Sequence, residues 1–225
     1  MKELNPKILM LVGPPGSGKG TQTELLAERF GYDIIHVSQI IRNKFENDAE
    51  NPEVIAAKDA YESGRLVDGK VIAKWVTTKI GELGKEAVTS GLILDGAGRT
   101  IQEASATIDL LDDFVAKDKI RVFFVKISPE ETLERNTKRI VCTKCLKPID
   151  PKLVGEINIC PHCEGKLGKR EMDQKSVIEN RLKVYEELTL PAVEYMRNEG
   201  LVIDVNGEQP IEDVYNDIAN HITVK

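Results

Sequence analysis

The chain has 225 residues and a formal net charge of −6 at pH 7, and 41% of its residues are hydrophobic. An acidic chain is not typical of proteins whose main partner is nucleic acid or a membrane surface, and no apolar run approaches the roughly 20 residues of a membrane helix. The N-terminal residues lead directly into a strand-like run without the apolar region of a signal peptide. We therefore expect a cytoplasmic protein whose cysteines stay reduced.

Five short apolar runs alternate with helical patterns and are interpreted as strands. They are residues 7–12, 34–37, 91–95, 120–127 and 201–205, and the helices include 21–30, 71–80 and a long one near 174–198 that Pro191 should kink. Strands that alternate with helices imply crossover connections and a parallel sheet. Two stretches break this rhythm, a helical one at 43–67 and one rich in Cys, Lys, Pro and Gly at 140–170. We expect both to form small lobes at strand ends.

The stretch GPPGSGKGT, residues 13–21, follows the first strand and opens the first helix. It matches the G-x-x-x-x-G-K core of a phosphate-binding P-loop, with the hydroxyl residue one position late. Glycines let backbone N–H groups point at phosphate oxygens, the helix N-terminus adds its dipole, and Lys19 brings a mobile positive charge. A plain Gly/Pro turn is the simpler alternative, but the strand–loop–helix context favours a phosphate site. The predicted phosphate-binding residues here are Gly13, Gly16, Ser17, Gly18, Lys19, Gly20 and Thr21.

Charged residues near the strand ends suggest phosphoryl transfer. Asp95 ends the third strand, which is the position of an acidic residue that holds Mg²⁺ through water beside a P-loop. Such chemistry needs positive charge around the phosphates, and the planar fork of arginine grips phosphate in two places. Arg135 and Arg139, four residues apart, are expected on one helix face. The candidates that flank the two lobes are Arg42, Arg99, Arg135, Arg139, Arg170 and Arg181.

Several motifs together resemble one known family. Besides GPPGSGKGT, they are Gly64-Arg65-Leu66-Val67, the LDGAGRT stretch at 94–100, Arg135 to Arg139 leading into Cys142, and the helix from Arg181 through Thr189 and Pro191 to Tyr195. Nearly end to end, the chain resembles the adenylate kinases of the long, zinc-bearing type, within the nucleoside monophosphate kinase family.

The resemblance implies an α/β fold, with a P-loop NTPase core whose five-stranded parallel sheet is flanked by helices. The core would comprise residues 1–37, 68–138 and 171–225, with a helical NMP-binding lobe at 38–67 and a zinc-ribbon-like lid at 139–170. It also implies a monomeric enzyme whose partners are small nucleotides. The implied reaction is the reversible, Mg²⁺-dependent transfer of the γ-phosphoryl group from ATP to AMP, which gives two ADP. Closure of both lobes would exclude water.

The resemblance also implies roles for individual residues. Arg135 and Arg139 would join the P-loop in binding ATP. The AMP-binding residues would be Val37, Arg42, Arg65, Val67, Arg99, Gln102, Glu103, Arg170 and Arg181. The catalytic residues would be Lys19, Asp95, Arg99, Arg139, Arg170 and Arg181.

The chain departs from the family pattern mainly on the acceptor side. Val37 replaces a threonine, residues 97–98 are Ala-Gly instead of Phe-Pro, and Met172 replaces a lid carboxylate. Glu103 stands at the spacing of the glutamine that reads the acceptor base, with Gln102 one residue earlier. An ionised glutamate only accepts hydrogen bonds, so it would suit guanine, whereas Gln102 would retain adenine. AMP is the expected acceptor, and GMP, CMP and UMP are the alternatives.

All four cysteines lie in one window as two pairs, Cys142-x-x-Cys145 and Cys160-x-x-Cys163, which is a strong zinc signal. Four thiolates would close a tetrahedral site, so the metal should be structural. Two disulfides or four free thiols are the alternatives, and His162 could replace one cysteine.

The cysteine window is also basic. Residues 138–170 carry eight Lys/Arg and three Asp/Glu, which suits a triphosphate or a nucleic-acid backbone. The window has no Phe, Tyr or Trp to stack on bases, so the ATP interpretation is preferred. The competing hypothesis is a non-catalytic P-loop module whose zinc lobe binds a partner or nucleic acid.

Overall fold

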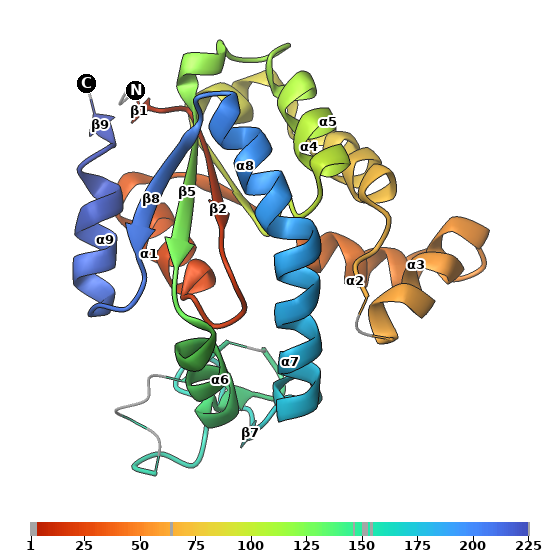
Figure 1. Cartoon of the computed structure of the whole chain (residues 1–225), viewed down its shortest axis with the longest axis vertical. Coiled ribbons are helices and arrows are strands. Elements are labelled where there is room, and N and C mark those ends of the chain that lie inside the picture. Colours follow the sequence, from red (N-terminus) through yellow and green to blue (C-terminus); the bar gives the residue numbers. More distant parts are fainter. Residues whose placement is uncertain (1–3, 64, 146, 150–152, 154, 225) are drawn as a thin grey trace.

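The structure is a computed structural model. Its centre is a parallel sheet of five strands (Figure 1). The strand order is β3 (Asp33–His36), β4 (Leu92–Asp95), β2 (Ile8–Val12), β5 (Ile120–Lys126) and β8 (Val202–Asn206). The central strand β2 is buried along its whole length. A strand covered on both faces needs apolar residues at every position, which is why it appears as a continuous run in the sequence. The predicted five-stranded parallel sheet is confirmed.

The structure describes residues 4–63, 65–145, 147–149, 153 and 155–224. Gly64 of the Gly64–Val67 motif lies outside the described residues. So do residues 1–3 and 225 of the predicted core, and residues 146, 150–152 and 154 of the predicted lid.

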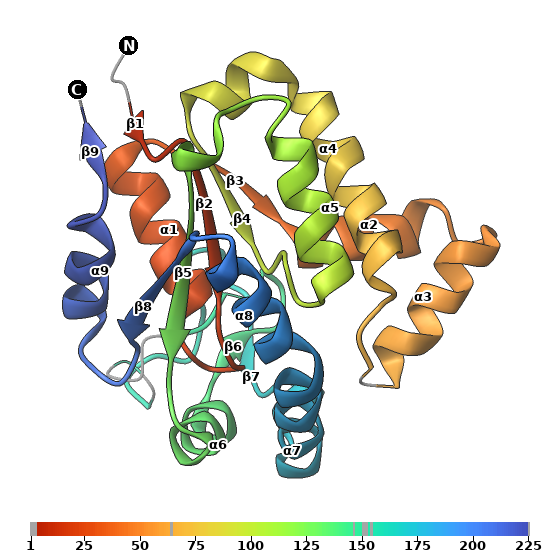
Figure 2. The ribbon, with the colours of Figure 1, turned by 45° about the horizontal axis from the view of Figure 1, so that its top comes forward.

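Helices cover both faces of the sheet (Figures 1 and 2). Successive side chains of a strand point to opposite faces, so Leu9 and Leu11 pack toward one group of helices and Ile8 and Met10 toward the other. The first group is α1 (Lys19–Phe30) and α9 (Ile211–Ala219), and the second is α4 (Gly69–Ser90), α5 (Ile101–Leu111) and α8 (Leu190–Asn198). A short pair, β1 (Leu4–Asn5) and β9 (Thr223–Val224), joins the two ends of the chain, and η1 (Lys117–Lys119) precedes β5.

Two predicted helices differ from the expectation in their extent. The helix predicted at 71–80 continues to Ser90, with a break in the backbone at Gly84 (φ 77°, ψ 168°). The long helix near 174–198 is divided into α7 (Lys175–Val184), a π-helical turn at Tyr185–Thr189 and α8. Pro191 stands in the first turn of α8, and a proline cannot donate to the preceding turn. The interruption therefore lies at the place where the kink was predicted.

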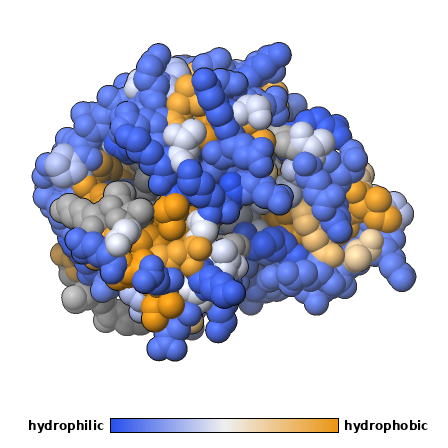
Figure 3. Space-filling model, turned by 90° about the horizontal axis from the view of Figure 1, so that it is seen from below, coloured by the Kyte–Doolittle hydropathy of each residue, from blue (hydrophilic) through white to orange (hydrophobic). Residues whose placement is uncertain are grey.

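The first insert consists of α2 (Val37–Asn47) and α3 (Pro52–Glu62), which project from the sheet (Figure 2). Val37, predicted to end a strand, is instead the first residue of α2. The start of α3 is fixed by Asn51, whose side chain accepts the N–H of Glu53 at 2.9 Å, and by Pro52 in the first turn. Seen from the end opposite the chain termini, this insert extends to one side of a largely hydrophilic face (Figure 3).

The second insert lies between α6 (Pro129–Lys138) and η3 (Glu171–Asp173). It contains the antiparallel pair β6 (Val141–Cys142) and β7 (Leu167–Gly168) around a small cluster of apolar side chains and cysteines. The prediction that Arg135 and Arg139 share a helix face is wrong. The helix ends at Lys138, and Arg139 has an extended backbone (φ −65°, ψ 130°) that turns its side chain toward η3. No helix among the described residues is long and apolar enough to cross a membrane.

Candidate active site

The loop at 13–21 is packed so closely against its neighbours that Gly13 and Gly16 have no room for a side chain. A Cβ on Gly13 would lie 2.3 Å from the carbonyl oxygen of Val125, and one on Gly16 would lie 2.5 Å from Nδ2 of Asn136. Gly16 also has φ +83°, a conformation that L side chains rarely adopt. The glycines therefore let the loop pass between β5 and α6, with the N-terminus of α1 behind it.

Lys19 folds back over this loop. Its Nζ donates to the carbonyl oxygens of Gly13 (2.8 Å) and Pro14 (2.9 Å) and to Ser17 Oγ (3.1 Å). Burial, with smaller contributions from the charges of the nearby arginines, lowers the pKa of Lys19 to about 7 against the opposing effect of Asp95. The ammonium group is buried among more positive than negative charges, so it is suited to bind an anion such as phosphate.

Asp95 stands at the carboxyl end of β4, opposite His36 at the end of β3 in the sheet register. His36 Nδ1 lies 3.0 Å from Asp95 Oδ2, and His36 Nε2 lies 3.6 Å from Glu24 on α1. Burial would raise the pKa of Asp95, but the His36 hydrogen bond and the Lys19 charge outweigh it and keep the pKa low. His36 is therefore a direct partner of the strand-end carboxylate.

Three of the predicted arginines gather around Lys19. The charges of Arg99, Arg181 and Arg139 all act on its ammonium group. Burial, together with Arg99 and Arg139, lowers the pKa of Arg181 to about 10. Like charges held this close repel one another, and a multiply charged anion would relieve the repulsion.

The remaining predicted cations lie around this centre. Burial lowers the pKa of Arg170, and the charges of Arg139 and Arg42 act on it. Arg135 in α6 donates to Glu131 at 2.6 Å and lies beside the loop at Gly16. Gly18, Gly20 and Thr21 form the turn and the start of α1. The phosphate loop and the arginines that flank the second insert are far apart in sequence. They nevertheless meet at the carboxyl edge of the sheet.

The predicted acceptor residues are more scattered. Arg42 is exposed on α2, while Val37 and Val67 are buried in the core. Arg65 is exposed and pairs with Asp59 of α3 at 2.6 Å. Sequence analysis missed Tyr61 of α3, whose phenol lies near enough to the arginine cluster to act on Arg170 and Arg181.

Glu103 does not present its carboxylate to an acceptor base, as the sequence interpretation expected. The side chain is buried, and its two oxygens accept the backbone N–H groups of Gly98 (2.9 Å) and Arg99 (3.1 Å). Thr100, three residues earlier, caps α5 by accepting the N–H of Glu103. The Thr-x-x-Glu spacing of a helix capping box was the signal in the sequence for this arrangement. Gln102 beside it is exposed.

The four cysteines come together as free thiols. Their sulfur atoms all lie within 4.8 Å of one another, with 3.4 Å between Cys142 and Cys163 and 3.7 Å between Cys145 and Cys160. Zinc–thiolate bonds of about 2.3 Å in a tetrahedron place the sulfurs about 3.8 Å apart, so the cluster fits zinc. His162 is not part of it, and this is the one such cluster among the residues that the structure describes.

Two backbone features support thiolate ligands. The N–H groups of Cys145 and Lys144 point at the Cys142 sulfur (3.4 and 3.3 Å) and lower the pKa of its thiol. Gly165 lies so close that an added Cβ would approach this sulfur to 2.8 Å. The pocket is therefore shaped around the sulfur atoms.

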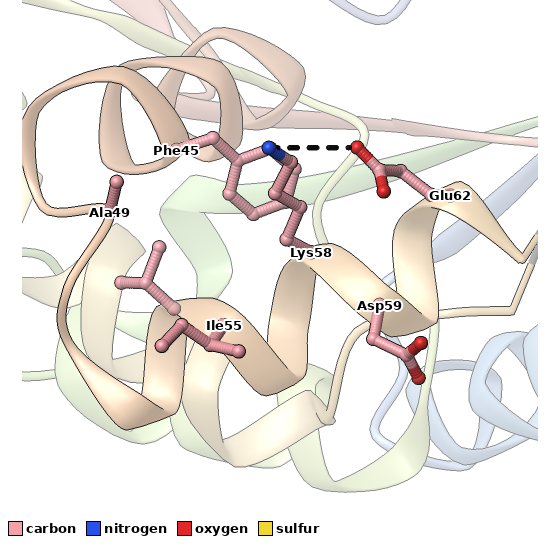
Figure 4. Close-up of a pocket in the computed structure, with 7 residues that line it drawn as sticks. Phe45, Ala49, Ile55, Lys58, Asp59 and Glu62 are labelled. Atoms are coloured by element: carbon pink, nitrogen blue, oxygen red, sulfur yellow. Dashed lines mark ion pairs between the residues drawn. The ribbon is translucent and has the colours of Figure 1, made fainter.

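A separate pocket of about 370 Å³ lies within the first insert, between α2 and α3 (Figure 4). Its lining includes Phe45, Ile55 and the ion pair of Lys58 with Glu62 at 3.8 Å. None of the predicted site residues lines it.

A P-loop, a strand-end aspartate and clustered arginines define a P-loop protein of the phosphotransferring class. A family model described as adenylate kinase matches residues 11–201. Curated relatives named adenylate kinase include those of Clostridium botulinum (strain Loch Maree / Type A3; 33% identical over 220 residues, 94% of this chain and 96% of the relative) and Methanothrix thermoacetophila (34% over 217 residues, 94% and 96%). That of Caldicellulosiruptor saccharolyticus is 33% identical over 225 residues, 96% of this chain and 99% of the relative. The chain belongs to the adenylate kinase family.

Proposed function

We propose that the protein transfers the γ-phosphoryl group of ATP reversibly to AMP and so interconverts ATP and AMP with two ADP. The observation that carries this proposal is the grouping of Lys19 with Arg99, Arg139 and Arg181 at the carboxyl edge of the sheet. A single bound phosphate does not need four cations. Two phosphate chains that meet end to end would use them all.

On the donor side, the loop at 13–21 would hold the ATP phosphates through its backbone N–H groups and Lys19. Arg135 and Arg139 would contact ATP from the side of α6 and the lid. Asp95, with its low pKa, would stay ionised and hold Mg²⁺ through water. When bound, Mg²⁺ would neutralise charge on the phosphates.

On the acceptor side, Arg42, Arg99, Arg170 and Arg181 would hold the AMP phosphate in line with the donor. Val37, Arg65, Val67 and Gln102 remain candidate contacts to the rest of the nucleotide. Since Glu103 is engaged with the backbone, the argument that it selects guanine no longer applies. Family membership supports AMP as the acceptor.

We infer the same division of the chain as the sequence suggests, with a core, an acceptor lobe at 38–67 and a lid at 139–170. The four cysteines would hold one structural Zn²⁺, which would replace the apolar core that so small a lid lacks. The free thiols agree with a reducing compartment such as the cytoplasm. We further infer a monomer that binds no nucleic acid or membrane.

A coupled assay with ATP, Mg²⁺ and AMP tests the proposal. The wild-type protein should form two ADP for each AMP consumed. Lys19→Met should lose at least about a hundredfold in turnover, because an electrostatic contact to the transferring group is removed. The matched control is Lys79→Met, since Lys79 is exposed on α4 and its ammonium group pairs with Glu82 at 3.0 Å. Equal activity of wild type and Lys19→Met would overturn the proposal.

A further inference from the structure

The loop that joins β4 to α5 contains two glycines with positive φ, Gly96 (+83°) and Gly98 (+74°). Glycine adopts such angles easily but also leaves them easily, so this loop needs an external restraint to keep one shape. Arg99 follows directly, and its side chain turns back so that Nε donates to the carbonyl oxygen of Gly96 at 3.0 Å. The direction of the guanidinium therefore depends on the shape of the loop.

Glu103 supplies that restraint from the first turn of α5. Oε1 accepts the N–H of Gly98 at 2.9 Å and Oε2 accepts the N–H of Arg99 at 3.1 Å, so each oxygen holds one loop residue. The residue is 2% exposed, which keeps water from competing for these bonds. Hydrogen bonds to an ionised acceptor are about twice as strong as neutral ones.

The arrangement differs from an ordinary capping box. There the glutamate reaches back to the N–H of the cap residue itself, which here is Thr100. Glu103 instead accepts the N–H groups of Arg99 and Gly98, which lie one and two residues before Thr100. It thereby joins the loop to the helix. The start of α4 closes the arrangement, because a Cβ on Gly69 would lie 2.1 Å from Thr100 Oγ1. Loop, cap and helix are thus packed as one unit.

Charge also ties Glu103 to Arg99. Burial raises the pKa of Glu103 to about 7, and the Arg99 charge and the two backbone N–H groups oppose the rise. The Arg99 charge is the largest effect that opposes the rise, so the arginine whose loop Glu103 holds also attracts its carboxylate.

We propose that Glu103 is a positioning residue, whose carboxylate holds the Gly96–Arg99 loop so that Arg99 is aimed at the acceptor's phosphate. The proposal rests on the proposed function for the role of Arg99. Position 103 then fixes how well any nucleoside monophosphate is held, and it does not select the base. A change at position 103 should therefore alter how strongly the acceptor binds without altering which acceptor is used.

Steady-state kinetics of Glu103→Gln test the proposal. The amide oxygen can accept one N–H, but its NH₂ group meets the other donor, so one strong bond is lost. The KM for AMP should rise about tenfold, while the turnover number and the KM for ATP stay within about twofold. The ratio of AMP to GMP use should not change. Asp109→Asn, at an exposed position of the same helix, is the matched control and should behave as wild type.

A double-variant cycle with Arg99→Ala shows whether Glu103 acts through Arg99. AMP binding, measured by calorimetry, should weaken about tenfold on Glu103→Gln in the wild-type background and less than about twofold in the Arg99→Ala background. The same loss in both backgrounds would overturn the proposal. So would a shift of Glu103→Gln between AMP and GMP, or an equal rise in both KM values.

The wild-type protein provides a test that needs no variant to fold and no turnover. In amide hydrogen exchange, the N–H groups of Gly98 and Arg99 should be protected to the same degree as those inside α5. Rapid exchange of both would overturn the proposal that Glu103 holds the loop. If both are protected but no monophosphate is phosphorylated, Glu103 still holds the loop and the proposed function fails.

Discussion

Arg139 and Asp173 form an ion pair across the base of the second insert. Arg139 Nε donates to Asp173 Oδ2 at 2.9 Å, and a second contact joins Nη2 to Oδ1. The two residues lie at opposite ends of the inserted segment, directly after α6 and at the end of η3. The pair therefore connects the two segments through which the second insert joins the rest of the chain. The side chain of Asp173 is 1% exposed, so it has little access to water.

Asp173→Asn should destabilise the fold strongly. It leaves Arg139 beside Arg181 and Arg170 without its carboxylate partner, and breaking a buried pair costs about 3 kcal/mol. Urea denaturation measures the loss in the free energy of unfolding. Glu134→Gln removes the partner of Lys138 in an exposed pair and should leave the free energy of unfolding nearly unchanged. Similar losses for the two variants would show that the segments that flank the second insert do not depend on the Arg139–Asp173 pair.

Glu103 should make stability depend on pH. Its pKa is raised from 4.5 to about 7 in the folded state, so the folded protein binds a proton that the unfolded chain has released. This contribution is fully present below about pH 4.5 and is lost as the pH rises through about 7, with a total of about 3 kcal/mol. Glu103→Gln cannot titrate. As the pH rises from 5 to 8, the wild-type protein should lose stability that the variant keeps. The free energy of unfolding of the variant, measured in urea, should therefore increase relative to that of the wild type. A difference that stays constant with pH would contradict the buried, ionisable carboxylate.

Metal content tests the cysteine cluster. The purified protein should contain about one zinc per chain, and removal by a chelator should lower the midpoint of thermal unfolding. Cys145→Ser should lose the metal, whereas Thr143→Ser keeps the neighbouring hydroxyl that donates to the Lys166 carbonyl and should retain it. Less than about half an equivalent of zinc in the wild-type protein would contradict a four-thiolate site.

Trp75, the one tryptophan of the chain, contacts the first insert, which we propose as the acceptor lobe. Its indole Nε1 donates to Glu53 of α3 at 3.2 Å, while Lys74 Nζ lies 3.1 Å from the same carboxylate. Movement of α3 against α4 should change the surroundings of the indole. AMP should therefore shift the tryptophan emission in the wild-type protein, and Glu53→Ala should shift it before any ligand is added. An emission spectrum that AMP leaves unchanged at saturation would show that the lobe does not move against α4.

The sheet and the phosphate loop could be predicted from the sequence because each depends on local constraints. The run of apolar residues from Ile8 to Val12 is required by a strand covered on both faces, and Gly13 and Gly16 are required where the loop touches β5 and α6. The direction of a side chain depends on packing instead. Arg139 was placed on a helix that ends one residue earlier, and Glu103 was placed toward a base although it turns into the protein.

Helices α5 and α9 were not named from the sequence, although each buries one face. In α5 the inward residues include Ala104, Ile108 and Leu111, and in α9 they include Val214 and Ile218. These spacings follow the helical period. His36 illustrates the opposite limit, because its pairing with Asp95 joins two strands whose register no local pattern reveals.

The acceptor itself is tested most directly by competition in one vessel. The protein is given limiting ATP, Mg²⁺ and equal amounts of AMP, GMP, CMP and UMP, and the diphosphates are separated by chromatography. ADP should account for nearly all of the product, with two ADP formed for each ATP consumed. One GDP, CDP or UDP formed for each ATP consumed would contradict AMP as the acceptor, and ADP formed without consumption of any monophosphate would contradict phosphoryl transfer.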